Sequence, residues 1–259
     1  MDIFGICIQT LIPVRETNSE RAEMITQIIF GDTYTINETI DNWVHITLTY
    51  DNYSGWIDKK LVTSIDYTQY SKISDEEGVL CSDTISVLHN LTTNSKINVV
   101  AGSTLPLSNE IGVVEIGDTK FEYLQKFNKY DCTADNIVYL AKQFENAPYL
   151  WGGRTVLGID CSGFSQIVFK LVGLALMRDA SQQVKQGGKI NTLTDAKPGD
   201  LAFFDNKKGS VIHVGILINN TQIIHASGWV RIDKIDNKGI FNLDTQEYTH
   251  HLCDIRRFI

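Results

Sequence analysis

The sequence predicts an α+β fold in which two small all-β barrels precede one helix-plus-sheet domain. The first half of the chain consists of short strand-like runs broken by turn residues. Near residue 131 the pattern changes to an amphipathic helix with a capping residue and a stop signal, and further strand-like runs follow. The predicted domains are residues 1–66, 67–130 and 131–259.

The two barrels are predicted from the spacing of strands and turns. The first contains TQIIFGDTYTINE, NWVHITLTY and YSGWIDKKLV, and the turns between them are Gly31-Asp32, Asp41-Asn42 and Asp51-Asn52. Short strands at this spacing are typical of a small antiparallel barrel. A weaker copy of the pattern follows in VLCSDTISVLHNL, KINVVAG and IGVVEIGDTKFEYL. We therefore expect a second barrel there.

Two helices are predicted in the third domain. The first follows Thr133, a capping residue, carries apolar residues at helical spacing and stops before Pro148. The second lies in GIDCSGFSQIVFK, where Asp160 is a plausible N-cap and an apolar stripe begins at Phe164. This assignment places Cys161 in the first turn of the second helix.

Composition excludes several classes of protein. With 43% hydrophobic and 21% charged residues, the composition is that of an ordinary globular protein. Its net charge of −8 disfavours the binding of polyanions, so we expect neither nucleic-acid nor membrane binding. No CxxC or HExxH pattern is present, and we expect no metal and no cofactor. The first residues make a poor signal peptide, and together with the thiols they favour a cytoplasmic location.

The cysteines differ in the chemistry that their contexts allow. Cys161 lies where unpaired backbone N–H groups and the helix dipole favour a thiolate, the form that attacks a carbonyl carbon. Most free cysteines are simply buried, however. We expect this bland role for the other cysteines, which lack histidine partners in the sequence: Cys7, Cys81, Cys132 and Cys253.

A nucleophilic thiol needs a base, and His213 and His225 lie in the predicted strands of the same domain. If Asn219, Asn220 and Thr221 formed a three-residue hairpin loop, His225 would lie opposite Gly215, on the same face as His213. A two-residue loop would put the two rings on opposite faces. With the longer loop, one imidazole can serve as base and the other can orient it. The pair His250 and His251 has the pattern of a solvated surface.

These residues resemble a known family. APYLWGG, GIDCSGF, RDASQQ, KPGDLAFF, HVGIL and IIHAS occur in this order, as in the NlpC/P60 cysteine peptidases, which have a papain-like α+β core. PVRETNSE, FGD, NWVHI and YSGWID are similar to bacterial SH3 (SH3b) domains. Two such domains before the peptidase resemble the γ-D-glutamyl-L-diamino acid endopeptidases, whose substrates are murein stem peptides of the form L-Ala-γ-D-Glu-diamino acid.

The resemblance implies a role for each matching residue. Cys161 would be the nucleophile, His213 the base and His225 the orienting third member. Tyr149 would help to bind or polarise the scissile carbonyl, unless this aromatic ring only packs.

Further residues would line the substrate cleft by the same resemblance, namely Trp151, Asp160 and Ser162. In the third motif no hydroxyl residue directly follows Arg-Asp, so a contact from Ser181, one position later, is less well supported. The backbone N–H of Cys161 is a natural oxyanion donor at a helix start.

The resemblance also gives the first barrel a role at the substrate. Glu23 would pair with a free N-terminal ammonium of L-Ala, and Tyr53 would close that end of the cleft or form a hydrogen bond there. The alternative is that Glu23 is a solvated strand-edge charge and Tyr53 a turn aromatic. Two other functions remain open: a cell-wall binding module, and a CHAP-like amidase or acyltransferase that keeps the thiol chemistry.

Overall fold

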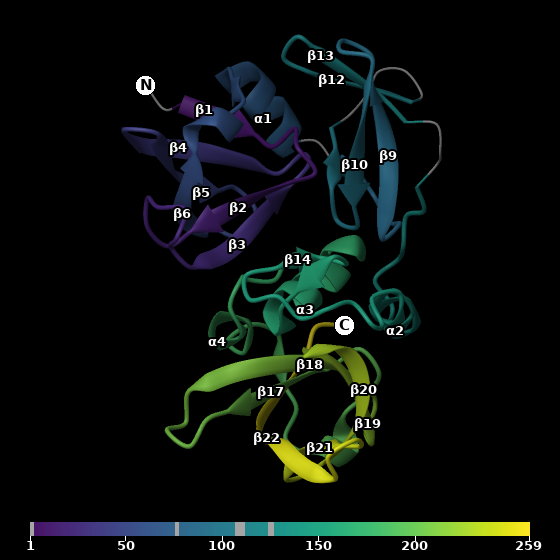
Figure 1. The fold of residues 1–259 in the computed structure, drawn as a ribbon. Helices are drawn as coiled ribbons and strands as arrows, with labels where there is room; N and C mark the ends of the chain where they lie inside the picture. The colour runs from purple at the N-terminus through teal and green to yellow at the C-terminus, as the bar shows by residue number, and fades with distance from the viewer. Residues whose placement is uncertain (1–2, 76–77, 107–111, 124–126) are drawn as a thin grey trace. The chain divides into compact units, whose positions relative to one another are not determined.

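The computed structural model describes residues 3–75, 78–106, 112–123 and 127–259. The chain divides into two compact units, residues 1–129 and 130–259 (Figure 1). Residues 76–77, 107–111 and 124–126 of the second predicted barrel lie outside the described residues. Among the described helices, none has the length and apolar character needed to cross a bilayer.

The first unit is built mainly from strands. Its elements are β1 (Ile3–Ile6), β2 (Leu11–Arg15), β3 (Met24–Ile29), β4 (Thr33–Ile40), β5 (Trp43–Leu48), β6 (Ser54–Asp58), a 3-10 turn (Lys59–Leu61), β7 (Ser64–Ile65), α1 (Tyr67–Asp75), β8 (Val79–Leu80), β9 (Ile85–Asn90), β10 (Ser95–Val100), β11 (Thr104–Leu105), β12 (Val113–Ile116) and β13 (Thr119–Glu122).

Two sheets dominate this unit, in the orders β3-β2-β6-β5-β4-β1-β7 and β10-β9-β13-β12. Alternate residues of β5 are buried, because successive side chains of a strand point to opposite faces. One hydrophobic cluster takes Phe4 and Phe30 from the first sheet region together with Leu88, Val99 and Phe121 from the second. The two regions therefore share part of their core, and the boundary near residue 66 stays a prediction.

The second unit contains both predicted helices. Its elements are α2 (Ala134–Lys142), β14 (Arg154–Thr155), β15 (Gly158–Ile159), α3 (Cys161–Leu171), α4 (Ala180–Gln183), β16 (Gly188–Lys189), a 3-10 turn (Leu193–Asp195), β17 (Leu201–Asp205), β18 (Val211–Asn219), β19 (Gln222–Ser227), β20 (Trp229–Asp236), β21 (Gly239–Asn242) and β22 (Glu247–Arg257). Thr133 caps α2 and Asp160 caps α3, as the sequence predicts.

Six strands of the second unit form a closed ring. The sheet follows the order β16-β22-β17-β18-β19-β20-β21, and a further pairing of β22 with β21 closes the ring of β17 to β22, while β16 pairs with β22 alone and lies outside the ring. Helix α3 packs against β18, and the ring of green and yellow strands lies beneath it in Figure 1. The core of this arrangement brings the start of α3 next to the strand that carries His213.

The hairpin between β18 and β19 corrects the predicted loop. Asn219 pairs with Gln222, so the loop has two residues and not three. The register then shifts, because Ile218 forms a β-bulge, and Gly215 still pairs with His225. The extra residue on one strand restores the parity that a two-residue loop would have lost. The predicted pairing is confirmed, although the predicted loop is wrong.

Candidate active site

Cys161 is the first residue of α3, directly after its cap. The Asp160 carboxylate accepts a hydrogen bond from the backbone N–H of Gly163 at 2.7 Å, which fixes the start of the helix. The Cys161 side chain is buried, with 6% of its surface exposed. Burial, followed by the neighbouring Asp160 charge, raises the pKa of the thiol to about 12. The expected preference for the thiolate is thus wrong for the free enzyme, because burial outweighs the helix start.

A buried arginine that the sequence reading missed holds this helix start together. Arg178 donates two hydrogen bonds to Asp160, at 3.1 Å and 2.6 Å, and a third to the Ser162 hydroxyl at 2.9 Å. The backbone N–H of Gly152 donates to the same carboxylate at 2.9 Å. Arg178 lies in the RDASQQ motif, which was the available signal. Asp160 and Ser162 are therefore bound into a buried network below the thiol.

The sulfur of Cys161 lies against strand β18. The backbone N–H groups of Val214 and Ser162 hydrogen-bond the sulfur and favour its charged form. Val214 directly follows His213 in β18, and α3 packs on this strand. The structure therefore brings the predicted nucleophile and the predicted base to the same place in the fold.

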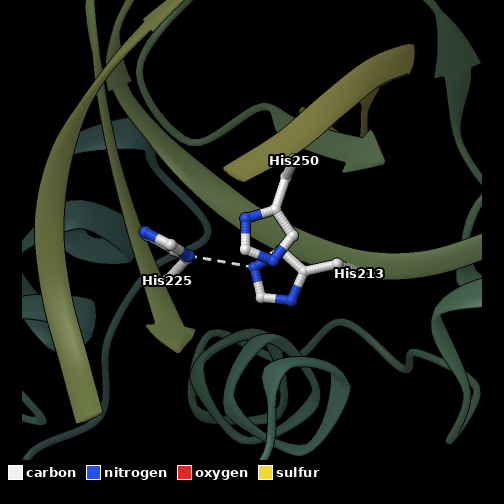
Figure 2. Close-up of side chains that lie close together, drawn as sticks. All are labelled: His213, His225 and His250. Atoms are coloured by element: carbon white, nitrogen blue, oxygen red, sulfur yellow. Dashed lines mark hydrogen bonds between the residues drawn. The ribbon is translucent and has the colours of Figure 1, made fainter. Parts of the chain in front are cut away.

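The predicted histidine pair forms a direct hydrogen bond. Nε2 of His213 lies 2.9 Å from Nδ1 of His225, and Figure 2 shows this bond as a dashed line. The two ring planes are nearly perpendicular, with centroids 5.1 Å apart. Both side chains are buried. This arrangement is the one that an orienting histidine requires.

A carboxylate continues the chain of hydrogen bonds. Nε2 of His225 lies 3.1 Å from Oδ2 of Asp233, which is 1% exposed. Arg231 binds both oxygens of Asp233, at 2.7 Å and 3.0 Å, and the Leu243 backbone N–H donates to Oδ1 at 3.1 Å. Burial alone would raise the pKa of Asp233, but the hydrogen bonds from His225 and Arg231 hold it at about 2. Asp233 is therefore ionised near neutral pH.

The ionised carboxylate fixes the tautomers of both rings. Asp233 can only accept, so Nε2 of His225 carries a proton and its Nδ1 is the acceptor. Nε2 of His213 then donates to that Nδ1, which leaves Nδ1 of His213 unprotonated. In Figure 2 this Nδ1 points away from His225. Burial lowers the pKa of both histidines, and that of His213 falls well below its usual range. His213 is therefore a neutral imidazole with one free lone pair.

His250 contradicts the predicted surface role, whereas His251 is exposed as expected. The His250 ring stacks on His213, with centroids 4.1 Å apart and planes 24° from parallel. Burial, and next the nearby His225, lower its pKa to about 4. The prediction was wrong because β22 pairs with β21 at this position, with His250 opposite Ile240. This pairing turns the His250 side chain toward His213.

The remaining predicted residues of this unit occupy different environments. Tyr149 is half-buried, and burial, followed by the neighbouring Cys161, raises the pKa of its hydroxyl, which places the ring beside the thiol. Trp151 is 56% exposed in the turn before Gly152, and Ser181 is exposed in α4. The substrate contacts assigned to these residues stay predictions.

Glu23 and Tyr53 both lie in the first unit. Glu23 is exposed directly before β3, and Tyr53 is half-buried directly before β6, where its backbone N–H donates to Asp51 at 3.0 Å. Strand β2 runs antiparallel to both β3 and β6, so these two strands start at the same end of the sheet. The two residues therefore share one end of this sheet, and their role at the substrate stays a prediction.

The other cysteines fall into two groups. Cys7 and Cys81 are buried, as expected. Cys132 and Cys253 are exposed, so the expectation of burial is wrong for them. Cys132 lies in the loop before α2, and Cys253 points outward from β22, where alternate residues face solvent.

Comparison with protein families matches two regions of the chain. Residues 146–256 match the NlpC/P60 family, and residues 14–60 match the bacterial dipeptidyl-peptidase Sh3 domain. The first match contains Cys161, His213, His225 and Asp233. The second contains Glu23 and Tyr53.

Relatives and a solved structure are similar to the chain over most of its length. The chain is 27% identical to a γ-D-glutamyl-L-lysine dipeptidyl-peptidase of Bacillus subtilis over 248 residues, which are 90% of this chain and 80% of the relative. It is 28% identical to dipeptidyl-peptidase 6 of Lysinibacillus sphaericus over 80% of this chain and 81% of that one. A crystal structure of an NlpC/P60 family protein from Bacillus cereus has the same fold, with a TM-score of 0.81, 20% identity, and coverage of 98% of this chain and 99% of that chain. Residues 146–256 therefore form an NlpC/P60 cysteine peptidase domain, and an N-terminal bacterial SH3 domain precedes it in the chain.

Proposed function

We propose that this peptidase hydrolyses the γ-D-glutamyl-L-diamino acid bond of murein stem peptides that have a free N-terminal L-Ala. The observation that carries the chemistry is the hydrogen-bonded series His213, His225 and Asp233 beside the buried Cys161 thiol. The choice of bond is supported by the similarity, over 90% of this chain, to the γ-D-glutamyl-L-lysine dipeptidyl-peptidase of Bacillus subtilis.

The first half of the reaction makes a thioester. Nδ1 of His213 takes the proton from the Cys161 sulfur as the sulfur attacks the γ-carbonyl carbon of D-glutamate. The developing oxyanion accepts a hydrogen bond from the backbone N–H of Cys161. When the carbonyl reforms, the carbon–nitrogen bond breaks, and His213 gives its proton to the amine of the diamino acid. The L-Ala-γ-D-glutamyl group stays on the sulfur.

The second half releases that acyl group. His213 takes a proton from water, the hydroxide attacks the thioester carbon, and the carbon–sulfur bond breaks as the proton returns to the sulfur. During both halves His213 is transiently a cation. His225 accepts the hydrogen bond from its Nε2, and the Asp233 charge stabilises the pair in the buried site.

Tyr149 and the helix-start network prepare the site for this reaction. The raised pKa of Tyr149 keeps its hydroxyl protonated, so it can donate a hydrogen bond to the scissile carbonyl. The buried bonds from Arg178 to Asp160 hold the first turn of α3, and with it the Cys161 N–H, in one position. In this proposal both features orient groups, while Cys161 forms the bond to the substrate and His213 moves the protons.

The direct test is mass spectrometry of L-Ala-γ-D-Glu-L-Lys and L-Ala-γ-D-Glu-meso-diaminopimelate after incubation with the protein. The proposal requires the masses of L-Ala-D-Glu and of the free diamino acid. A sugar-linked peptide incubated in parallel and cleaved between its lactyl group and L-Ala would instead indicate a CHAP-like amidase, and an acyl product on added amines in place of the free acid would indicate an acyltransferase. Intact peptide with tight binding would indicate a binding module.

We also propose that the enzyme works in the cytoplasm on released peptides, as part of murein peptide recycling. Such an enzyme should hydrolyse isolated wall peptides and leave whole sacculi intact. A zymogram with embedded sacculi tests this point, and strong clearing would contradict it without affecting the assignment of the scissile bond.

A further inference from the structure

We propose that His213, His225 and His250 form a binding site for a divalent transition metal of the zinc class. One ring nitrogen from each of these histidines lies within 4.8 Å of the others. Figure 2 shows the rings converging from three separate strands, β18, β19 and β22. Imidazole nitrogen is a preferred ligand of Zn²⁺, and three histidines with one open position are a common zinc ligand set.

His225 already has the environment of a metal ligand. Its Nε2 proton is directed to the buried Asp233 carboxylate at 3.1 Å, which leaves the lone pair of Nδ1 toward the cluster. A carboxylate behind a histidine fixes the tautomer and raises the basicity of the ligating nitrogen in many zinc sites. Arg231 holds that carboxylate in place with two further bonds. The groups that would orient His225 as a metal ligand, Asp233 and Arg231, are therefore already in place.

His250 supplies the third nitrogen. Its Nδ1 lies 2.8 Å from the Thr249 hydroxyl, and this hydroxyl in turn donates to the backbone carbonyl of Ile240. When His250 carries its proton on Nδ1, the hydroxyl oxygen accepts from Nδ1–H and the hydroxyl proton is available for the longer contact to the Ile240 carbonyl oxygen at 3.5 Å. This tautomer leaves the lone pair on Nε2 of His250 free to bind a metal.

Metal binding requires small movements. Zinc–nitrogen bonds of 2.0–2.1 Å in a tetrahedron place ligand nitrogens about 3.3 Å apart. His213 and His225 are now at 2.9 Å, so they must separate slightly. The nearly parallel rings of His213 and His250 must also rotate until their lone pairs converge. The half-buried His250 has more room for this rotation than the two fully buried rings.

The metal would change the protonation of His213. Its Nε2 must be unprotonated to bind the metal, so its single proton moves to Nδ1, and no net proton is released. Nδ1 is the atom that acts as base in the proposed function, so the metal-bound enzyme cannot accept the thiol proton. We therefore expect reversible inhibition. Binding itself does not depend on the proposed function, whereas the inhibition does.

The binding experiment uses the full-length Cys161→Ala variant, so that the thiol cannot hold the metal. Zn²⁺ is titrated by calorimetry, and Co²⁺ is added as a spectroscopic probe. His250→Phe in the same background keeps a ring to stack on His213 but has no ligand nitrogen, and His250→Asn is a second variant in case the larger ring disturbs the fold. His251→Gln is the matched control, because this neighbouring histidine is exposed and bonds to Asp205.

We expect saturable binding of one Zn²⁺ by the Cys161→Ala protein, with a Co²⁺ spectrum that lacks a sulfur charge-transfer band. Loss of the His250 nitrogen should weaken binding by more than about tenfold, since even second-shell partners of a metal ligand are worth 10- to 100-fold. His251→Gln should leave binding unchanged. No saturable binding to Cys161→Ala, or equal binding by the His250 variants, would overturn the proposal.

An activity arm then tests the consequence with the Cys161 enzyme. Zn²⁺ should inhibit hydrolysis, a chelator should restore it, and His250→Phe should need more than about ten times the Zn²⁺ for half-inhibition of its own basal rate. Equal inhibition of both proteins would show that the metal acts elsewhere, such as on the thiol alone. Failure of hydrolysis in every protein would contradict the proposed function and leave the binding result standing.

Discussion

Cys161 and His213 both rest in their uncharged forms, because burial raises the pKa of the thiol and lowers that of the imidazole. The thiol proton must therefore pass from Cys161 to His213 during the attack on the carbonyl carbon, because no thiolate–imidazolium pair exists beforehand. We expect Cys161→Ala and His213→Ala each to reduce kcat by about 10³-fold or more. Steady-state kinetics measure this, and circular dichroism checks that the variants remain folded. A Cys161→Ala protein that kept a tenth of the activity would rule out the mechanism.

His225 and Asp233 act on the reaction through the orientation of His213. His225→Asn retains a side chain that can accept from Nε2 of His213, so it should keep more activity than His225→Ala. Asp233→Asn removes the charge that fixes the His225 tautomer, and we expect kcat to fall by about 10²- to 10⁴-fold with little change in KM. The kcat values and the pH–rate profiles of the three variants test this role. Equal losses in His225→Asn and His225→Ala would argue against it.

The sequence predicted some of these residues and missed others for physical reasons. The cap at Asp160 and the thiol behind it follow a local pattern, so short-range rules found them. Arg178 reaches Asp160 from a separate loop, and a buried ion pair between distant residues leaves no periodic signal. Asp233 could have been found once the pairing of His225 with Arg231 was known. Asp233 follows Arg231 by two positions and therefore lies on the same face of the sheet.

At the level of elements, the hairpin of β18 and β19 decides whether the two histidines meet. The bulge at Ile218 compensates for the two-residue loop, and the half-buried Ile218 is the residue without a partner in the ladder. Loop length and bulges are set by tertiary packing, so the pairing of Gly215 with His225 was predicted correctly from a wrong loop length. The caps of α2 and α3 are set by local sequence, and these two helices were predicted with their starting residues, whereas the short capped helix α4 was not predicted.

Because of the bulge, we expect opposite effects on activity from two deletions in β18. Deleting Ile218 removes the bulge and leaves Gly215 opposite His225, so we expect a folded enzyme that keeps most of its activity. Deleting both Leu217 and Ile218 leaves no bulge to absorb the change and turns His213 to the other face of the sheet. Activity should then be lost. The two proteins are compared by kcat/KM, and equal activities would show that the register is set elsewhere.

Considered as a whole, the molecule should lose stability in mild acid. His213, His225 and His250 have pKa values below the ordinary 6.5 in the folded state, the last at about 4. Below about pH 6.5 the unfolded chain therefore binds protons that the folded chain does not. The stabilisation is complete above that pH and is lost below it, by up to about 1.4 kcal/mol per pH unit for each histidine.

Urea unfolding at several pH values, with a chelator present, measures this dependence. His250→Phe should show a shallower fall in the free energy of unfolding between about pH 6.5 and 5, because one titrating group is gone. His251→Gln should follow the wild type. A slope that is the same in the wild type and His250→Phe would mean that His250 titrates normally.

Recognition of the substrate amine is a prediction about the first unit. If Glu23 pairs with the ammonium of L-Ala, Glu23→Ala should lower kcat/KM for free peptides by an amount equivalent to about 1.5–3 kcal/mol. N-acetylation of the substrate should cost the wild type a similar amount. The two losses should not add, because each removes the same contact. Additive losses in a four-way comparison of kcat/KM would assign the amine to another group.

The closed ring of strands in the second unit has a consequence for association. Within residues 130–259, all of which the structure describes, each strand from β17 to β22 has a hydrogen-bonded neighbour on both sides, because β21 and β22 join the ends. A sheet without free edges offers no template to which another polypeptide can add a strand. We therefore expect the ring of the second unit to resist strand addition in concentrated solutions, because addition would first require β21 and β22 to separate.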